Sequence, residues 1–369
     1  MSTLNEAAER SPAEFEKALA TASAAQASFE EEHKGALTRI QHFLHQYPTS
    51  VPFLVLVIGI ACFTIPLPRF VDGQLQFVAL AGVRFFSAFN LSLILQQVTI
   101  IATLGIAQTL VILTAGIDLS CGMLMALGSI VMTKFAVDFG MNPYLAIACG
   151  LLVSTAFGFL NGSLITFVRL PAFIVTLGTL NIAFAITQIY SAAQTVSGLP
   201  EPLLFFGNTF KLGDTTITYG TVLMIALYLF AWYVLRSTAP GRHVYALGNN
   251  AEATRLMGIH TRTLLLTVYT LAGFIYGVAG LLLVARTGVG DPNAGQTDNL
   301  DSITAVVLGG TSLFGGRGLI LGTLIGALIV GVFRNGLTLM GVPSVYQILI
   351  TGILVILAVA TDQLSRRRG

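Results

Sequence analysis

Apolar and polar residues alternate in long blocks along this chain of 369 residues. A polar opening segment ends at about residue 46, the first apolar run begins at Val51, and similar runs follow almost to the C-terminus. Because a helix needs about 20 mostly apolar residues to cross a bilayer, each long run predicts a membrane-spanning helix. The predicted spans are 51–66, 91–114, 119–137, 145–168, 172–193, 218–235, 264–285, 319–339 and 345–360.

A tenth apolar stretch, residues 303–316, is short and rich in glycine, and it can be either a full span or a re-entrant element. Loop charges favour a span, because cytoplasmic loops of membrane proteins carry an excess of Lys and Arg. The loop 236–262 carries four Arg against one Glu, residues 366–368 are all Arg, and 286–301 carries three Asp against one Arg. Ten spans place the first two segments inside and the third outside, with both termini cytoplasmic.

These spans predict an all-α polytopic membrane protein of about ten transmembrane helices. Composition agrees, because the chain is 54% hydrophobic and only 10% charged, whereas soluble domains carry about 25% charged residues. Soluble globular and disordered proteins are thereby excluded. We expect a polar cytoplasmic tail at 1–46, a transmembrane domain at 47–365 and, within it, a cytoplasmic loop at 236–262.

A short motif occurs twice in the chain, and we call its two copies the echo segments. Gly-Phe-Leu-Asn-Gly at 158–162 precedes Pro171 and an apolar run, and Gly-Val-Phe-Arg-Asn-Gly at 331–336 precedes Pro343 and another apolar run. In the predicted topology the first segment ends at the inner face and the second at the outer face. This predicts an inverted internal repeat, which in transporters places the substrate path at the interface between the repeats.

Charge, cysteines and motifs exclude further classes. The net charge of +2 gives no basis for a nucleic-acid partner, and the three Cys lie in apolar runs with no His or Cys at ligand spacing. Neither a disulfide scaffold nor a metal site is predicted. A P-loop requires a Lys directly after a Gly, but none of the four Lys follows a Gly, and H-E-x-x-H and G-x-S-x-G are absent. No catalytic residue is therefore predicted.

Asp118 is the acid that the sequence places nearest the membrane interior, in Thr-Ala-Gly-Ile-Asp-Leu-Ser-Cys-Gly at 114–122. Ionisable residues inside the membrane are rare and usually functional, so one interpretation is a broken helix at which Asp118 contacts a polar substrate or an ion. The alternative is an N-cap, in which the carboxylate accepts backbone N–H bonds of the following helix. The two interpretations are compatible.

The predicted cytoplasmic loop contains a short helix. Asn249 or Asn250 can cap it, the helix runs to Met257, and Gly258 stops it. Glu252 falls in the first turn, where an acid complements the helix dipole. Such a helix between two spans can dock a cytoplasmic partner, and a solvated connector is the alternative.

Residues 308–318 are dense in glycine at a predicted membrane boundary. The segment has no lysine and no flanking strand, so it is not a phosphate-binding loop. Glycine permits tight turns and close approach of helices, and we therefore predict a packing or gating turn. Its residues are Gly309, Gly310, Gly315 and Gly316.

Four motifs together resemble a known family. They are Gly-Ile-Asp-Leu-Ser at 116–120, Pro-Ala-Phe-Ile-Val-Thr-Leu-Gly at 171–178, Gly-Arg-His-Val-Tyr-Ala-Leu-Gly-Asn at 241–249 and Val-Leu-Gly-Gly-Thr-Ser-Leu-Phe-Gly-Gly-Arg-Gly at 307–318. In their order and spacing, over about residues 52–364, the chain is similar to the membrane permease of bacterial ribose-type ABC (ATP-binding-cassette) sugar importers. Within that family the stretch 296–304 looks closest to fructose permeases.

The resemblance implies a homodimeric permease of the bacterial inner membrane that imports a monosaccharide, with fructose as the first candidate and ribose or xylose otherwise. It also implies a cytoplasmic ATPase that binds ATP and Mg²⁺, a periplasmic sugar-binding protein, and no cofactor in this chain. The coupling helix is assigned to 250–258, with Gly241 and Arg242 before it. Ala115 and Cys121 depart from the family pattern. The implied coupling residues are Gly241, Arg242, Asn250, Glu252, Arg255 and Gly258.

Polar residues within the spans are the candidates for a substrate path, although each can equally be a hydrogen-bond partner between helices. They are Gln96, Gln97, Gln108, Thr114, Asp118, Asn161, Thr176 and Asn181. Two alternatives stay open: an ABC permease for another solute, such as branched-chain amino acids, and an ion-coupled secondary carrier with Asp118 as its cation site. An intramembrane enzyme is disfavoured because no nucleophile–base pair is visible.

Overall fold

The computed structural model describes residues 50–64, 66–71, 74–79, 83–353 and 356. The chain divides into two compact units, Met1–Ser50 and Val51–Gly369. The predicted tail at 1–46 and the terminal arginines lie outside the described residues. Apart from Ser50, the architecture below is that of the second unit.

The first half of the described chain consists of helices and one small hairpin. Its elements are α3 (Ser50–Thr64), β1 (Pro66–Val71), β2 (Gln74–Ala79), η1 (Val83–Phe86), α4 (Ala88–Leu113), α5 (Cys121–Val137), α6 (Pro143–Ser163), the π-helical segment η2 (Leu164–Val168) and α7 (Ala172–Ser191). The two strands pair antiparallel. Polar caps begin two of the long helices: Ser87 accepts the N–H of Asn90 at α4, and Asn142 accepts the N–H of Tyr144 at α6.

The second half follows the same plan. Its elements are α8 (Glu201–Leu204), η3 (Phe205–Gly207), β3 (Thr209–Leu212), β4 (Thr215–Thr218), α9 (Tyr219–Ser237), α10 (Ala239–Asn249), α11 (Ala251–Leu256), α12 (Thr261–Thr287), α13 (Asp298–Leu308), α14 (Ile320–Leu339) and an apolar helix at Ser344–Ile353. β3 and β4 pair antiparallel, and the Thr216 N–H donates to the Ser92 hydroxyl of α4 at 2.8 Å. This bond ties the hairpin to the start of α4.

Each of the nine long apolar runs coincides with a helix within the described residues. Six helices are long and apolar enough to cross a membrane, namely Ala88–Leu113, Pro143–Val168, Ala172–Ser191, Tyr219–Ser237, Thr261–Thr287 and Ile320–Leu339. Three shorter apolar helices occur at Pro52–Thr64, Cys121–Val137 and Ser344–Ile353. The predicted end of the last span, up to residue 360, lies outside the described residues. The all-α membrane fold is confirmed.

The tenth stretch is not the helix that the sequence predicts. α13 covers Asp298–Leu308 rather than 303–316, and the glycines after Leu308 lie in turns. At 1.5 Å per residue a helix of this length extends about 16 Å, against about 30 Å of hydrocarbon. A crossing here would need α13 together with the turns that follow it, and the count of about ten spans stays a prediction.

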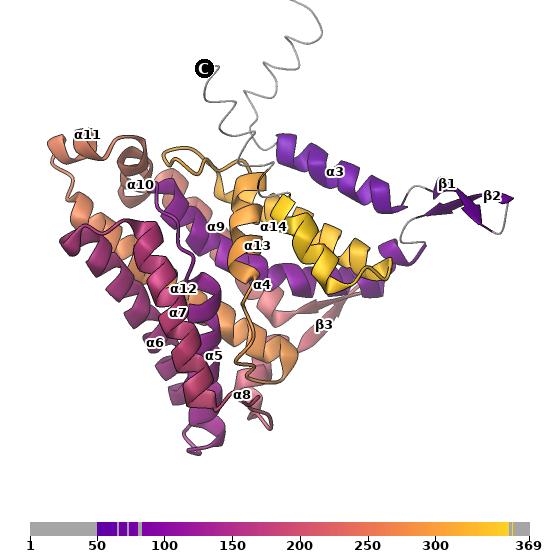
Figure 1. Cartoon of the computed structure of the whole chain (residues 1–369), viewed down its shortest axis with the longest axis horizontal. Helices are drawn as coiled ribbons and strands as arrows, with labels where there is room; N and C mark the ends of the chain where they lie inside the picture. The colour runs from indigo at the N-terminus through magenta and orange to yellow at the C-terminus, as the bar shows by residue number, and fades with distance from the viewer. Residues whose placement is uncertain (1–49, 65, 72–73, 80–82, 354–355, 357–369) are drawn as a thin grey trace, which may run out of the picture. The chain divides into compact units, whose positions relative to one another are not determined.

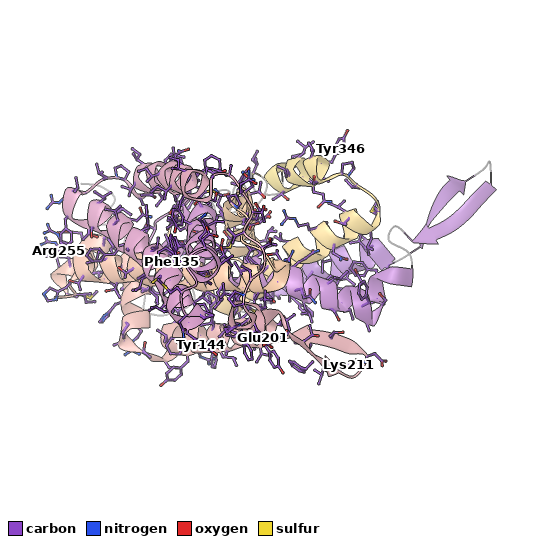
Figure 2. The ribbon with its side chains drawn as sticks, turned by 90° about the horizontal axis from the view of Figure 1, so that it is seen from below. Phe135, Tyr144, Glu201, Lys211, Arg255 and Tyr346 are labelled. Atoms are coloured by element: carbon purple, nitrogen blue, oxygen red, sulfur yellow. The ribbon has the colours of Figure 1, made fainter. Side chains whose placement is uncertain are left out.

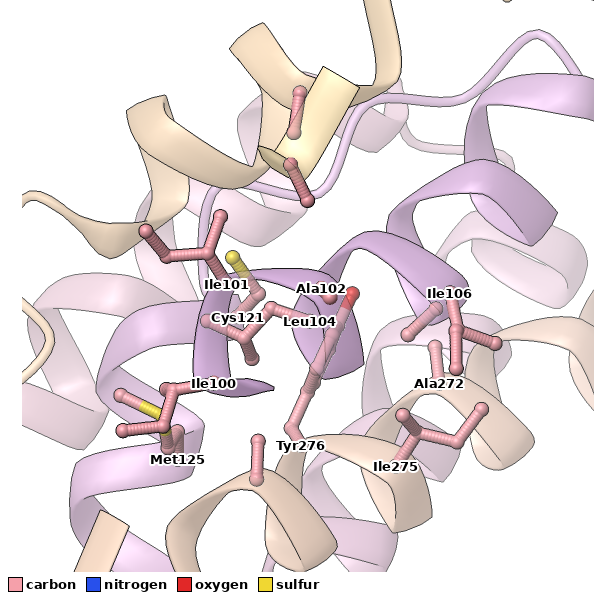
Figure 3. Close-up of a cluster of buried hydrophobic side chains, with 14 of the residues drawn as sticks. Ile100, Ile101, Ala102, Leu104, Ile106, Cys121, Met125, Ala272, Ile275 and Tyr276 are labelled. Carbon is pink, nitrogen blue, oxygen red and sulfur yellow. The ribbon is translucent and has the colours of Figure 1, made fainter. Parts of the chain in front are cut away.

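α4 and α12 form the centre of the packed helices, and every residue of α4 from 98 to 113 is buried. A helix that is apolar on all sides needs neighbours on all sides. Figure 3 shows part of this core, where Leu104 of α4 lies among Met125 of α5 and Tyr276 of α12. α7 and α9 instead expose large apolar side chains, such as Ile189 and Phe230. Such surfaces suit lipid or a further membrane subunit.

The internal echo has a structural counterpart. α6 packs along α12, as Figure 1 shows, and α14 packs along α4. A Cβ on Gly158 of α6 would overlap the backbone of Tyr269 and Gly273 in α12, and a Cβ on Gly331 of α14 would overlap Val98 of α4. The glycines of the echo therefore make the close contact between the two halves of the chain.

Both echo segments also end in the same backbone turn. Arg169 has φ 61° and Gly341 has φ 75°, so each adopts the left-handed conformation two residues before Pro171 or Pro343, and a helix follows each proline. A two-fold relation between the halves pairs α4 with α12 and α6 with α14. It therefore accounts for both contacts, α6 on α12 and α14 on α4. This arrangement supports the inverted repeat.

Candidate functional site

The segment between α4 and α5 is a break in the helical structure, and Asp118 lies at its centre. α4 ends at Leu113, Ala115 has φ 61°, and α5 begins at Cys121. The Asp118 side chain is fully buried. One carboxylate oxygen accepts the backbone N–H of Ser120 at 2.8 Å and also its hydroxyl, and the other accepts the Tyr276 hydroxyl at 3.1 Å.

The predicted N-cap is therefore displaced by two residues. Ser120 is the N-cap of α5, and it makes no side-chain capping bond of its own. The carboxylate of Asp118 instead accepts the N–H of this N-cap residue. Because both carboxylate oxygens already have protein donors, a cation at Asp118 would have to displace Ser120 or Tyr276.

Side chains from four other helices hold the backbone of this break. Gln108 of α4 donates to the carbonyl of Asp118, and Thr176 of α7 donates to the carbonyl of Ile117 at 3.2 Å. Backbone that is not helical must find such partners inside a membrane. The two remaining contacts are Asn161 Nδ2 of α6 to the Ser120 hydroxyl at 3.1 Å and Asn299 Nδ2 of α13 to the Leu119 carbonyl at 3.3 Å.

The eight predicted path residues separate into two groups. Gln108, Asp118, Asn161 and Thr176 belong to this buried network, and Thr114 is buried with its hydroxyl bonded to the Val111 carbonyl of its own helix. Gln96, Gln97 and Asn181 line cavities, of which those at Gln97 and Asn181 measure about 480 and 190 Å³. The first group holds the fold of the break, and the second faces open space.

Sequence reasoning missed the charged residues that surround the larger cavity. Arg286 of α12, Asp298 of α13 and Arg334 of α14 line it together with Gln97. Arg334 lies inside a predicted span, and an ionisable residue at such a position is itself a sequence signal. Asp301, read as part of an outer loop, is buried in α13 and forms an ion pair with Arg334 at 2.9 Å. Asp118 is thus one of two buried acids among the described residues.

The cytoplasmic loop folds as two helices, α10 and α11. α11 has the predicted cap, because Asn250 Oδ1 accepts the Ala253 N–H at 2.9 Å, and Gly258 takes a left-handed φ of 86° after its end. The helix is shorter than the predicted 250–258. Gly241 and Arg242 precede α11, as the resemblance implies, and they lie within a helix of their own, α10.

The surface of α11 combines an ion pair with exposed apolar side chains. Arg255 approaches Glu252 at 2.6 Å, both side chains are exposed, and the guanidinium lowers the pKa of Glu252. Figure 2 shows Arg255 at the edge of the molecule. Leu256 and Met257 next to it are 74% and 68% exposed. A short helix that presents both charge and apolar surface is suited to docking a protein partner.

The glycine-rich turn connects α10 to the break. The Gly316 N–H donates to the Leu113 carbonyl at the end of α4 at 3.0 Å, and a Cβ on Gly248 of α10 would overlap both Leu113 and Gly316. Gly315 lies against Ala115, and the Tyr245 hydroxyl of α10 donates to the Gly318 carbonyl at 2.9 Å. We call this contact of α10, the turn and the break the glycine junction.

The four predicted turn residues have distinct positions. Gly310, Gly315 and Gly316 have φ values of 84°, 83° and 71°, a conformation that favours glycine. Gly309 instead permits close packing, because a Cβ there would overlap the backbone of Gly322 in α14. The segment is therefore a packing turn in this conformation.

Comparison with known proteins agrees with this architecture. A family model described as the permease component of branched-chain amino acid transport systems matches residues 90–359. A fructose import permease protein of Rhizobium meliloti is 47% identical over 372 residues, which cover 100% of this chain and 99% of that protein. A ribose import permease protein of Escherichia coli is 43% identical over 283 residues (76% and 87%), and a D-allose transport system permease protein of the same organism is 35% identical over 289 residues (78% and 88%).

The chain therefore belongs to this family of transport-system permease components. It is a multi-pass inner-membrane subunit of an ABC importer and not an enzyme. An importer of this type includes an ATPase and a binding protein in addition to the permease.

Proposed function

We propose that this chain is the permease subunit of a monosaccharide importer, with D-fructose as the first substrate to test. Relatives named for fructose, ribose and D-allose import support a sugar. The description of the family model names branched-chain amino acids, which makes leucine the rival substrate. The observation that carries the transport mechanism is the glycine junction, because it links an exposed docking helix to the buried break.

The proposed mechanism begins at α11. A cytoplasmic ATPase, which binds ATP and Mg²⁺, docks on α11 through the Glu252–Arg255 pair and the exposed Leu256 and Met257. Its movement is transmitted by α10, because Gly248 has no free space against Leu113 and Gly316. The end of α4 and the break then shift together, and α4 lies at the centre of the core.

The membrane arrangement completes the proposal. A periplasmic binding protein delivers the sugar, both termini are cytoplasmic, and a second copy of the chain packs on the exposed apolar side chains of α7, such as Ile174, Leu177 and Ile189. Asn181 lies on α7 and, with Gln296 and Asn299, lines a cavity of about 190 Å³. This polar surface is the proposed lining of the path between the copies.

The test is uptake by proteoliposomes that contain the permease, its ATPase and its binding protein. We expect ATP-dependent accumulation of labelled D-fructose, with competition by D-ribose or D-allose and none by L-leucine. Accumulation of leucine with no uptake of any sugar would refute the substrate class while leaving the transport mechanism in place.

A further inference from the structure

We propose that the cavity at Gln97 is a binding site for a neutral polyol, here a monosaccharide, within the permease chain itself. The inference rests on the proposed function and adds to it a place where the sugar pauses inside one subunit. The cavity of about 480 Å³ lies within the size range of small-molecule sites, about 300–1,000 Å³. It lies between α4, α12, α13, α14 and the segment that leads into the last described helix.

The charges around the cavity balance, which favours a neutral ligand. Arg334 is compensated by Asp301 at 2.9 Å. Arg286 and Asp298 are the remaining cation and anion, and within the described residues neither forms an ion pair with any group. An ionic ligand would add a charge that has no opposite charge left to compensate it. A neutral molecule leaves the balance intact.

Three of the polar groups that face the cavity lack a good hydrogen-bond partner among the described residues. Gln97 Oε1 is buried without a hydrogen-bond partner, and the Asp298 carboxylate has no hydrogen bond among the described residues. Both are acceptors, whereas Arg286 is a donor whose one recorded bond is a long contact of 3.5 Å to the Gln96 carbonyl. A hydroxyl both donates and accepts. A polyol can therefore satisfy all three groups at once.

The distribution of polar residues distinguishes a sugar from an amino acid. Seven of the eleven lining residues are polar, and they come from all five surrounding elements. A zwitterion such as leucine carries its polar groups at one end only, and it would leave Gln97 without a partner. The apolar part of the lining includes Ile100, Ile101 and Leu283 of the central helices, which suits the C–H faces of a sugar ring.

The position of the cavity fits a transit site, because Asp298 in its lining is adjacent to Asn299, which lines the proposed path. It lies where α12 and α14 end and in the first half of α4, which the loop charges predict to be the outer side. Its described lining contains no aromatic ring, so we expect weak binding. Weak binding is what a path requires, because a ligand must leave a site as readily as it enters.

The experiment measures sugar binding to the permease–ATPase complex in lipid nanodiscs, without the binding protein, by saturation-transfer NMR with D-fructose and D-ribose as probes. We expect saturable millimolar binding. Gln97→Leu should weaken it about three- to tenfold, the loss of one neutral hydrogen bond, and Asp298→Asn about tenfold. Gln194→Leu is the control, because that exposed side chain lies outside the cavity, and it should leave binding unchanged.

Transport by the same variants separates the two proposals. If the wild-type importer accumulates sugar but Gln97→Leu and Asp298→Asn bind and transport like the wild type, the site is wrong and the proposed function stands. If the wild type accumulates no sugar and the complex instead binds L-leucine with the same dependence on Asp298, both the polyol and the proposed substrate are wrong. Equal losses in Gln194→Leu and Gln97→Leu would also overturn the site.

Discussion

The two helix breaks of this permease occupy related places in the repeat, yet they are built in opposite ways. The first, 114–120, buries Asp118 and bonds both of its carboxylate oxygens. The second, 288–297, leads to Asp298, whose carboxylate faces a cavity and has no bonded partner among the described residues. The breaks touch where Gly122 and Gly295 leave no room for a Cβ between them. The helix break is thus a rigid, hydrogen-bonded segment in the first half of the chain, whereas in the second half it leads to an open polar site.

The difference shows why polarity alone does not identify a substrate path. A buried polar group with all its partners stabilises one conformation, whereas a polar group without partners is available to a ligand. Asp118 and Asp298 have the same side chain and nearly the same sequence context, between glycines and an apolar helix. They differ in burial and in the number of their bonded partners among the described residues.

The largest effect on stability is expected from Asp118→Ala. It removes the acceptor for Ser120 and Tyr276 and leaves buried donors unpaired, which costs about 3 kcal/mol. The thermal unfolding midpoint of the purified permease should fall markedly, and uptake should be lost. Asp298→Ala is the counterpart: it removes no bonded acceptor, so it should lower the midpoint less than Asp118→Ala while weakening sugar binding. Similar midpoints for both variants would contradict the comparison.

The next effect concerns the glycine junction. Gly248→Ala forces a Cβ against Leu113 and Gly316, and overpacking of this kind costs about 1–3 kcal/mol. We expect lower uptake per ATP hydrolysed, because the joint between α10 and the break is displaced. Gly352→Ala in the last described helix is the control, since its Cβ would meet nothing within 4 Å. Equal uptake-to-hydrolysis ratios in the two variants would remove the junction from the mechanism.

A smaller effect is expected from Tyr276→Phe. The change removes one of the donors to Asp118 and keeps the ring, so the loss should be about 1–2 kcal/mol of stability. Denaturation of the purified protein measures it. Tyr144→Phe, at a side chain that is 70% exposed, should leave stability unchanged. A wild-type denaturation profile for Tyr276→Phe would show that the Asp118 joint does not depend on this bond.

The smallest effect on the permease itself is expected from Glu252→Ala combined with Arg255→Ala. The pair is exposed on α11, so its removal should leave membrane insertion and the unfolding midpoint unchanged. Co-purification of the ATPase should nevertheless weaken, because docking uses this surface. If the ATPase co-purifies normally, α11 is not the coupling helix.

The sequence predicts the long helices because each is a continuous apolar run, and it predicts the cap at Asn250 because capping is local. It misplaces α13, since Asp298 and Asp301 read as an outer loop and the short apolar stretch at 303–316 runs on into the predicted glycine turn. The compensating partner of Asp301 is Arg334, which lies on another helix, and no local pattern reveals such a pair.

The candidate path residues show the same limit. Gln97 and Gln108 lie on one helix and have the same side chain, but Gln108 bonds the Asp118 carbonyl and Gln97 faces the cavity. The neighbouring helices determine this difference, and the spacing of the two residues along α4 does not. The sequence does not predict the glycine junction either, because the junction joins segments near residues 113, 248 and 316, which meet only in the folded chain.

The most direct test of an ATP-driven permease is to identify the source of energy for uptake. Proteoliposomes with the permease, its ATPase and its binding protein should accumulate D-fructose when ATP is present and ionophores have collapsed the proton and sodium gradients. Without the ATPase, accumulation should stop even when both gradients are intact. Uptake that continues without the ATPase and ends when either gradient collapses would show an ion-coupled carrier and contradict the account.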